Sequence, residues 1–469
     1  MNKLGSEQGE RIMSSDFMNM NRRGFMRSTA LLGATAFGSS FVNMPFAYAQ
    51  DFKPTSDETV YFRGWQFRTD VVQSNVDAYN KAFSGKVNYA TVTGDYPAVM
   101  EKALIANEQL DVLYANPSSA VRYSGGGWVL PASELPNGQE IMDGMYPNIR
   151  EAWSVDGKLL GLSYFVTTRG ALHVFTKPFL EAGFTEDQLP TTWDALYETV
   201  YALQEKGVAT PILPHWFGEY FGISWGFVFE VMNRGGEVAD PATHEPKLTL
   251  DGPAGKTLEA WKKLWKSGLV PEEVFSYNEA GYIDAFRSGR YVFSPQQLYD
   301  LKTFNDKAQS GDVAGHVSLL SGKDQSWGLI DSALYVMTAR KGRSDALTDD
   351  VKKFVSWYGY KDENGKYAVA ERWLKENMLF SAYKDVMESE EARSAVSSSL
   401  MRPEDYDRVL EVYAKTPYPK GIWNVVWSEE FNFWLREKLF AFLQQDLEAE
   451  SVIEEANTKI KELNERYKI

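Results

Sequence analysis

The chain has 469 residues, a formal net charge of −15 and no cysteine. A chain of this length can build two packed cores, and the lack of cysteine excludes disulfides, iron–sulfur clusters, thiolate zinc sites and cysteine nucleophiles. The negative charge repels phosphate backbones and anionic lipids, which argues against nucleic acid or a membrane surface as a partner.

The first fifty residues have the pattern of an export signal. Arg22 and Arg23 precede a mildly apolar run at residues 30–42, and a small residue, Ala49, ends the segment where a signal peptidase would cut. The run is too short to span a bilayer, because a spanning helix needs about 20 apolar residues. The paired arginines resemble a twin-arginine signal. We therefore expect removal of residues 1–49 and a periplasmic protein without a membrane anchor.

The mature chain begins with alternating strand and helix patterns. Residues 60–62 and 87–91 are short β-branched and aromatic runs, and the segment 72–83 between them repeats apolar residues at helical spacing. A second helical pattern at 99–105 leads into an apolar strand at 110–114. Two consecutive strand–helix–strand units predict a parallel sheet covered by helices.

Ligands of parallel sheets bind beyond the carboxyl ends of the strands. The residues that follow the three predicted strands are therefore candidates for a binding site. The polar and aromatic residues chosen among them are Trp65, Gln66, Asp95, Asn116 and Ser118.

A second α/β unit is predicted from residue 171 onward. Its expected elements are strands at 171–175, 210–213 and 290–293, and helices that begin after Thr192 or cover 258–268 and 282–289. The last third of the chain is helical, and apolar residues repeat on one face of its terminal segment. No low-complexity linker separates the two units, so we expect strands to join them.

Five short strings occur in a fixed order along the mature chain. They are Leu110-Asp111-Val112-Leu113-Tyr114; Gly157-Lys158 to Gly161-Leu162, followed by the strand from Gly170 to Lys177; Pro190-Thr191-Thr192-Trp193-Asp194; Ala285-Phe286-Arg287-Ser288-Gly289-Arg290; and Trp423 with Trp427 before a long terminal helical pair. Together they resemble the extracellular solute-binding proteins of carbohydrate ABC importers, the maltose-binding-protein-like group. The resemblance covers nearly all of the mature chain.

The resemblance implies an α/β protein of the type II periplasmic-binding-protein fold, with two lobes joined by crossover strands at a hinge. The implied lobes are residues 50–169 with 328–378, and residues 170–327 with 379–469. They would close on a small molecule, most simply a carbohydrate, and present it to the transmembrane subunits of the importer. The resemblance further implies a monomer with no cofactor, no resident metal and no catalysis.

A sugar presents hydroxyl groups around its rim and apolar C–H faces, so its receptor needs flat rings together with amides or carboxylates. Core packing is the alternative for each aromatic residue. We expect ring contacts from Trp65, Trp216, Trp225, Tyr299, Trp423 and Trp427, and hydroxyl contacts from Gln66, Asp95, Asn116, Glu219, Gln297 and Asp331.

Two places qualify the resemblance. Glu219 and Tyr220 resemble an acid and a ring in a Glu-Pro-Tyr-Phe segment through which the group holds sugar, but the proline is missing and Trp225 is a second candidate for that place. Ser118 stands where maltodextrin binders have an acid, which argues against a maltodextrin-like ligand.

Arg169 stands at the first predicted crossover, where the resemblance places an acidic residue. Two roles suit it. Its planar guanidinium matches a carboxylate, sulfonate or phosphate on a ligand, and it also matches a salt bridge with Asp331 on the neighbouring crossover strand. The sequence leaves both interpretations open.

Other classes of function are less well supported by the sequence. The four histidines, at 173, 215, 244 and 316, have no metal-ligand spacing, so we expect no zinc site. Carboxylate pairs for glycoside hydrolysis depend on the fold, which keeps a periplasmic glycan-degrading enzyme as an alternative. A receptor for polyamines or other small molecules on the same fold, and a secreted scaffold, are the remaining alternatives.

Overall fold

Strands β1 (Val60–Gly64), β2 (Val87–Thr91) and β3 (Val112–Ala115) form the parallel sheet that the sequence predicts, with β1 between the other two. The crossover helices α1 (Thr69–Phe83) and α2 (Tyr96–Ile105) match the predicted helical patterns.

The computed structural model describes residues 51–219, 221–322 and 327–469. They all belong to one unit, Tyr48–Ile469. The predicted export signal, with Arg22, Arg23 and Ala49, lies outside the described residues.

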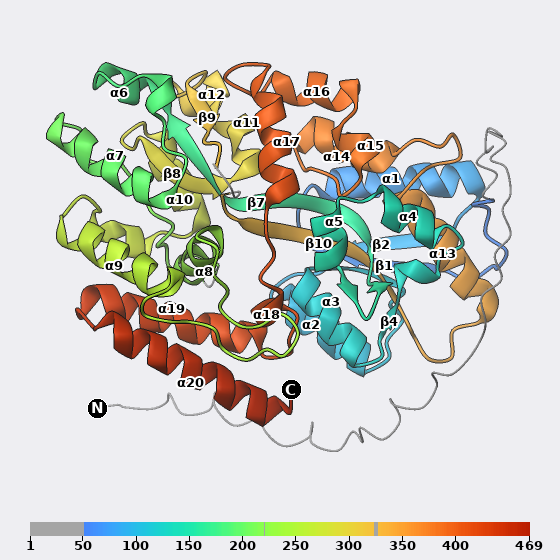
Figure 1. Ribbon diagram of the computed structural model, residues 1–469. Coiled ribbons are helices and arrows are strands. Elements are labelled where there is room, and N and C mark those ends of the chain that lie inside the picture. The colour runs from blue at the N-terminus through green and yellow to red at the C-terminus, as the bar shows by residue number, and fades with distance from the viewer. Residues whose placement is uncertain (1–50, 220, 323–326) are drawn as a thin grey trace, which may run out of the picture. The chain divides into compact units, whose positions relative to one another are not determined.

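Two long antiparallel strands extend the sheet. β10 (Leu329–Thr338) pairs with β3 on one side and with β7 (Leu162–Phe175) on the other, and β7 then pairs with β8 (Phe293–Gln297) and β9 (Val317–Leu319). The strand order is β2-β1-β3-β10-β7-β8, and β4 (Val129–Leu130) pairs with β10. Figure 1 shows β7 and β10 running between β1 and β2 at one end and β8 and β9 at the other. β10 and β7 therefore connect the three parallel strands to β8 and β9 within one sheet.

The remaining elements surround this sheet. β5 (Ser154–Val155) and β6 (Lys158–Leu159) form a separate hairpin. The helices after α2 are α3 (Pro117–Gly125), α4 (Gly138–Gly144), α5 (Pro147–Ala152), α6 (Thr176–Glu181), α7 (Trp193–Glu205), α8 (Ile223–Asn233), α9 (Pro253–Lys266), α10 (Glu279–Arg287), α11 (Leu301–Phe304), α12 (Lys307–Ser310), α13 (Asp345–Gly359), α14 (Ala368–Asn377), α15 (Lys384–Met387), α16 (Glu390–Ser397), α17 (Asp405–Lys415), α18 (Lys420–Trp423), α19 (Ser428–Gln444) and α20 (Ala449–Tyr467).

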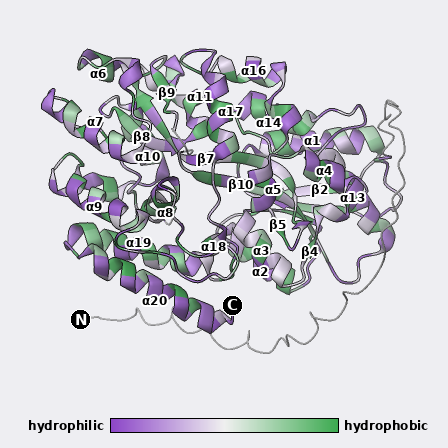
Figure 2. Cartoon of the chain, in the orientation of Figure 1, coloured by the Kyte–Doolittle hydropathy of each residue, from purple (hydrophilic) through white to green (hydrophobic). Residues whose placement is uncertain are grey.

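Hydropathy follows this arrangement. Figure 2 shows apolar colour along the central strands, whereas outer helices such as α9 and α20 carry both colours. The apolar face predicted for the terminal segment is buried on α20, at Val452, Ile453, Ala456, Ile460 and Leu463. None of the described helices is both long and apolar enough to cross a membrane.

The prediction of a strand at 210–213 is wrong. Only Ile212 forms a bridge, in parallel with Phe293. Pro211 and Pro214 flank this position, and proline has no N–H to donate to a longer ladder.

Two glycines shape the crossing strands. Gly170, inside β7, and Gly328, just before β10, have φ values of +83° and +84°. A Cβ atom on Gly328 would lie 2.2 Å from the carbonyl oxygen of Arg169. Only glycine combines this backbone conformation with so close an approach.

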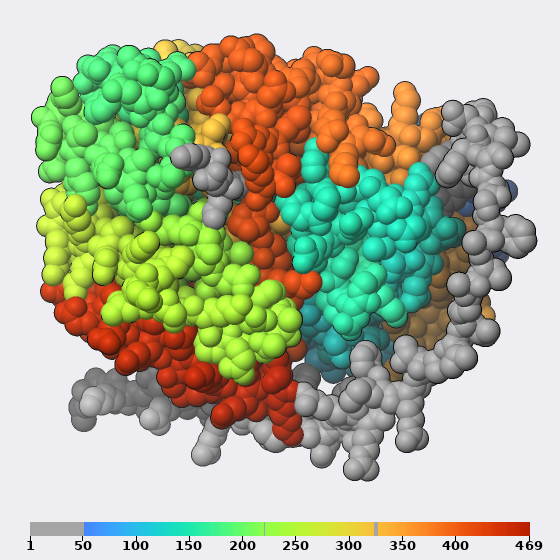
Figure 3. All heavy atoms as spheres, in the orientation of Figure 1, coloured from blue at the N-terminus to red at the C-terminus, as the bar shows by residue number. Residues whose placement is uncertain are grey.

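A further segment follows the two long strands. Between α17 and α18, the carbonyl oxygen of Pro417 accepts a hydrogen bond from the N–H of Ile330 at 2.9 Å, and the hydroxyls of Thr168 and Thr416 lie 2.7 Å apart. In Figure 3 the orange-red atoms of this part of the chain fill the strip between the green atoms and the teal atoms.

Candidate functional site

Strand register brings several predicted site residues to one face of the sheet. Arg169 on β7 is paired with Gln297 on β8, and Thr167, two residues earlier on β7, is paired with Asp331 on β10. Because side chains alternate along a strand, Arg169 and Thr167 share a face, and their partners share it too. The backbone pairing therefore gathers Arg169, Gln297 and Asp331.

Arg169 forms two ion pairs. Its Nε donates to Oδ2 of Asp331 at 2.9 Å, and its Nη1 donates to Oε1 of Glu279 at 2.8 Å. Of the two interpretations of Arg169, the structure shows the salt bridge with Asp331. The Arg169 side chain is 8% exposed, whereas Asp331 and Glu279 are 19% and 32% exposed.

The pKa of Arg169 follows from these contacts. Burial alone would lower it, but the carboxylates of Glu279 and Asp331 raise the pKa of Arg169 above its ordinary value. The guanidinium therefore stays charged, and its charge is offset by two acids.

Gln297 completes the polar group. Its Nε2 donates to Oδ2 of Asp331 at 2.9 Å, and its Oε1 faces the backbone N–H of Asp300 in a capping box. We call Arg169, Glu279, Gln297 and Asp331 the Arg169 cluster. An amide oxygen has two lone pairs, so Gln297 Oε1 can also accept a hydrogen bond from a ligand hydroxyl.

Aromatic rings flank the Arg169 cluster. The guanidinium carbon of Arg169 lies 4.5 Å from the ring centre of Phe221 and 5.5 Å from that of Trp225. Trp225 in turn lies 4.2 Å from Trp423, which is also 5.3 Å from Tyr418. Phe221 and Trp225 are half-buried, and Trp423 is 4% exposed. The rings and the polar group together offer both kinds of contact that a sugar or polyol needs.

Acidic groups extend the Arg169 cluster. Oε2 of Glu219 accepts a hydrogen bond from the backbone N–H of Glu279 at 2.6 Å, at the start of α10. Asp300 is buried, and burial together with Glu279 raises its pKa to about 8. Burial raises the pKa of Tyr299, which is half-buried, well above its ordinary value. Tyr220 lies outside the described residues.

Trp65 belongs to a second aromatic group. Its ring lies 4.9 Å from Tyr114, 5.4 Å from Tyr96 and 5.8 Å from Tyr164. Trp65 is half-buried and its neighbour Gln66 is exposed. Tyr164 is on β7, the strand that also carries Arg169.

Three other predicted residues take part in helix starts. Asp95 caps α2, with Oδ1 accepting from the N–H of Ala98 at 3.3 Å. Asn116 caps α3, with Oδ1 accepting from the N–H of Ser119 at 2.8 Å and from Oγ of Ser118 at 3.0 Å. Capping explains these residues locally, because it satisfies N–H groups at the helix ends.

Trp216 and Trp427 lie in the core. Trp216 is 0% exposed and packs 5.2 Å from Trp261, and Trp427 is 1% exposed and donates its Nε1 to Oδ1 of Asn464 at 3.0 Å. Neither ring therefore presents a face at the surface.

Sequence reasoning missed Glu279 and Phe221. Glu279 follows Asn278, a good helix-capping residue, and that signal marks a helix start but not a neighbour of Arg169. Its role depends on how the 219–221 segment and α10 pack against β7, which no local pattern reports.

His215 has a structural place near the Arg169 cluster. Its Nδ1 and Nε2 lie 3.2 Å from the carbonyl oxygens of Pro295 and Phe221, and burial together with Arg169 lowers its pKa to about 3. Within the described residues, no group of three or more histidine or acidic side chains is placed to hold a metal ion.

Solved structures show the same fold. Maltose-bound MalE3 of T. maritima aligns with a TM-score of 0.67 at 16% identity, over 86% of this chain and 99% of that one. The cyclic alpha-maltosyl-1,6-maltose binding protein of Arthrobacter globiformis aligns with a TM-score of 0.69 at 14% identity, over 86% and 98%. A solute-binding protein of Agrobacterium vitis with bound D-mannitol gives 0.63 at 14% identity, over 87% and 98%.

No family model matches the sequence, and no curated protein matches it. At sequence identities of 14–16%, the similarity to these structures shows a shared fold. The chain therefore has the α/β fold of the type II, maltose-binding-protein-like solute-binding proteins, as the resemblance implies.

Proposed function

We propose that this chain is the exported, periplasmic substrate-binding component of an ABC importer, and that it binds an uncharged sugar or polyol at the Arg169 cluster. The observation that carries the proposal is the Arg169 cluster itself. It places a charge-compensated guanidinium and a buried amide oxygen beside the half-buried rings of Phe221 and Trp225. An arginine already offset by two acids has little charge left for an acidic ligand.

The proposed lobes are residues 50–169 with 328–378, and residues 170–327 with 379–469. Gly170, inside β7, and Gly328, just before β10, would form the hinge, because both have positive φ values along the crossing segments. On this proposal Trp65 and Gln66 belong to one lobe and Trp225 to the other, and closure would bring both to the ligand. The closed monomer would then deliver the ligand to the transmembrane subunits without catalysis.

An amine is a second candidate ligand. Glu219, Glu279 and Asp331 outnumber Arg169 in this region, and an excess of carboxylates beside aromatic rings suits a polyamine. The two candidates differ in charge, which makes them separable by salt, since only amine binding should weaken strongly as ionic strength rises.

A thermal-shift panel of monosaccharides, oligosaccharides, polyols, sugar acids and polyamines tests the function. A ligand at a hundred times its dissociation constant adds about 2.7 kcal/mol to the free energy of unfolding. A stabilising sugar or polyol supports the first candidate, and a stabilising polyamine supports the second. Hydrolysis of a chromogenic glycoside by the pure protein would contradict both.

The site is tested with Trp225→Ala. Loss of a stacking ring should weaken binding of the ligand found in the panel about 10- to 100-fold, which corresponds to about 1.4–2.8 kcal/mol of binding free energy. The matched control is Trp265→Ala, another half-buried tryptophan, which packs against Phe275 at 5.1 Å. Equal affinities of the two variants, measured by calorimetry, would place the site elsewhere.

A further inference from the structure

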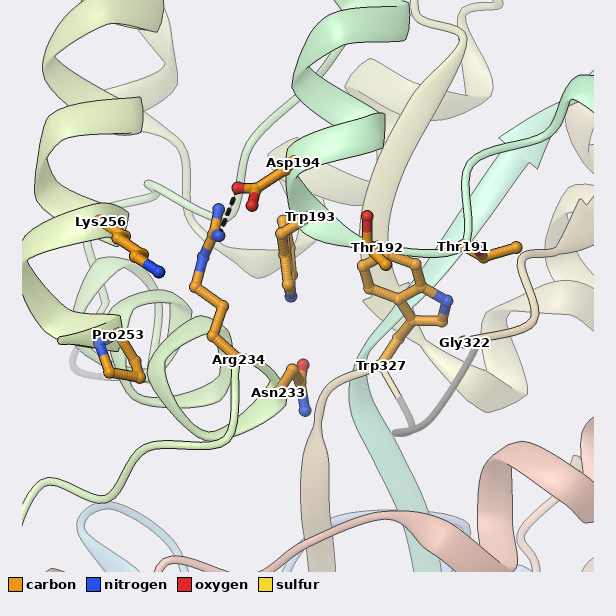
Figure 4. Close-up of a pocket in the computed structure, with 10 residues that line it drawn as sticks. All are labelled: Thr191, Thr192, Trp193, Asp194, Asn233, Arg234, Pro253, Lys256, Gly322 and Trp327. Atoms are coloured by element: carbon orange, nitrogen blue, oxygen red, sulfur yellow. Dashed lines mark hydrogen bonds and ion pairs between the residues drawn. The ribbon is translucent and has the colours of Figure 1, made fainter.

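A separate cavity lies at the starts of α7 and α9. Its volume is about 250 Å³, and its lining shares no residue with the Arg169 cluster. Figure 4 shows Trp193 on α7, Lys256 on α9 and Arg234 beyond the end of α8 facing one another across this space. A cavity below the usual range of about 300–1,000 Å³ for drug-sized ligands suits a small molecule.

The backbone contributes positive partial charge at this cavity. The two helices that begin at it have 13 and 14 residues. A helix N-terminus carries about half a positive charge and has N–H groups without partners inside the helix. Two such ends at one cavity favour an anion.

Lys256 adds a full positive charge. It lies in the first turn of α9, and its side chain forms no hydrogen bond or ion pair with the described residues. Arg234 lies beside it but is 8% exposed and pairs with Glu230 at 3.0 Å and Asp194 at 2.5 Å. Lys256 is therefore the cation that remains for a ligand.

The indole of Trp193 points independently to a ligand. Trp193 is 5% exposed, and its Nε1 is buried without an acceptor among the described residues. Figure 4 shows this nitrogen pointing toward Asn233, at the floor of the cavity. The amide of Asn233 is already engaged with the backbone of Gly328, at 2.8 and 3.1 Å. A buried donor without an acceptor is costly, so an oxygen atom of a ligand would complete it.

We propose that this cavity binds a small anion, whose phosphate or carboxylate oxygens accept hydrogen bonds from Lys256 Nζ and Trp193 Nε1. The ring of Trp327 lines the same space, with its centre 5.1 Å from that of Trp193. It would contact any apolar part of the bound anion. This site is additional to the proposed sugar site and does not depend on it.

Indole N–H signals in ¹H–¹⁵N spectra of the whole protein test the proposal. Trp193→Phe removes one signal and so assigns it, while keeping a ring in place. The probes are inorganic phosphate, glucose 6-phosphate, glucuronate and neutral glucose, each at an ionic strength matched with sodium chloride. At least one of the three anions should move the Trp193 signal, and glucose should not.

The affinity arm uses Lys256→Gln, with Lys266→Gln as the matched control. Lys266 lies on the same helix but faces Asp446 at 2.9 Å. The active anion should bind Lys256→Gln at least tenfold more weakly than the wild type, and Lys266→Gln within about twofold of it. The proposal is overturned if no anion moves the Trp193 signal beyond chloride, or if Lys256→Gln binds as tightly as the wild type.

Discussion

Two arginines of this chain have nearly the same local description. Arg169 and Arg234 are each 8% exposed, and each is paired with two carboxylates. The acids differ. Asp331 and Glu279 are 19% and 32% exposed beside Arg169. Around Arg234, one acid is 1% exposed and the other 75%.

Glu230, the buried acid beside Arg234, has both carboxylate oxygens in hydrogen bonds. Oε2 of Glu230 accepts from the hydroxyl of Tyr197 at 2.9 Å and from Nε1 of Trp261 at 2.7 Å, while Oε1 accepts from Arg234. Such a carboxylate holds α7, α8 and α9 together and leaves no oxygen for a ligand. Asp331 and Glu279 are partly open to solvent, which is why an equivalent ion pair there is suited to recognition.

The largest expected effect follows from removing Glu230, the buried partner of Arg234. Glu230→Ala leaves Arg234 buried with only an exposed partner, and breaking a buried pair costs about 3–5 kcal/mol of the free energy of unfolding. Glu279→Ala should cost about 1 kcal/mol or less, because its carboxylate is partly screened by solvent. Urea denaturation of both variants measures the difference.

The same pair of variants reverses its order in ligand binding. Glu279→Ala should lower the affinity of the Arg169 cluster for its ligand. Glu230→Ala should leave that affinity unchanged at temperatures where the variant is folded. If Glu279→Ala proves the more destabilising of the two, burial of the acid is not what separates the two arginines.

Sequence patterns predicted the fold better than the site. The β-branched strands and the apolar face of α20 depend on local periodicity, and the structure has both. Asp331 was predicted as a partner of Arg169 because both belong to recognisable crossover strands. Glu279 was missed because its contact with Arg169 arises only when α10 packs against β7.

Tryptophan shows the same limit. Trp225 is half-buried and Trp427 is fully buried, although both occur in similar aromatic and polar stretches. The side of a short helix that faces the core depends on the elements packed around it, so residue type alone does not separate a stacking ring from a core ring.

An intermediate effect concerns the backbone between the two arginines. Gly328 lies 2.8 Å from Asn233 on one side and packs against the backbone of Arg169 on the other. Gly328→Ala should destabilise the protein by more than the roughly 1–3 kcal/mol typical of a strained backbone, because the new Cβ also meets the carbonyl of Arg169.

Gly342→Ala separates strain from contact. Gly342 has a φ of +77°, and a Cβ there would meet no atom within 4 Å. Its cost should be limited to about 1 kcal/mol of conformational strain. Equal melting temperatures for the two variants would show that β7 and Gly328 move apart easily.

The last expected effect is a pH slope from Asp300. Burial and Glu279 raise its pKa to about 8 in the folded chain, against about 3.9 when unfolded. The folded state then holds a proton that the unfolded state has lost, so stability falls as pH rises from about 4 to about 8. Burial acts oppositely on His173 and His215, whose folded pKa values are lowered to about 4 and about 3.

These two histidines reduce the stability of the folded protein only as pH falls below about 6.5, which is the pKa of histidine in the unfolded chain. Between about pH 6.5 and 8, the decline assigned to Asp300 should therefore appear in the wild type and be smaller in Asp300→Asn, which keeps an oxygen to accept from the N–H of Gln297. Chemical denaturation at several pH values gives both slopes. Parallel slopes would mean that Asp300 is ionised in the folded protein, and that the surroundings of the Arg169 cluster carry one more negative charge than the raised pKa of Asp300 indicates.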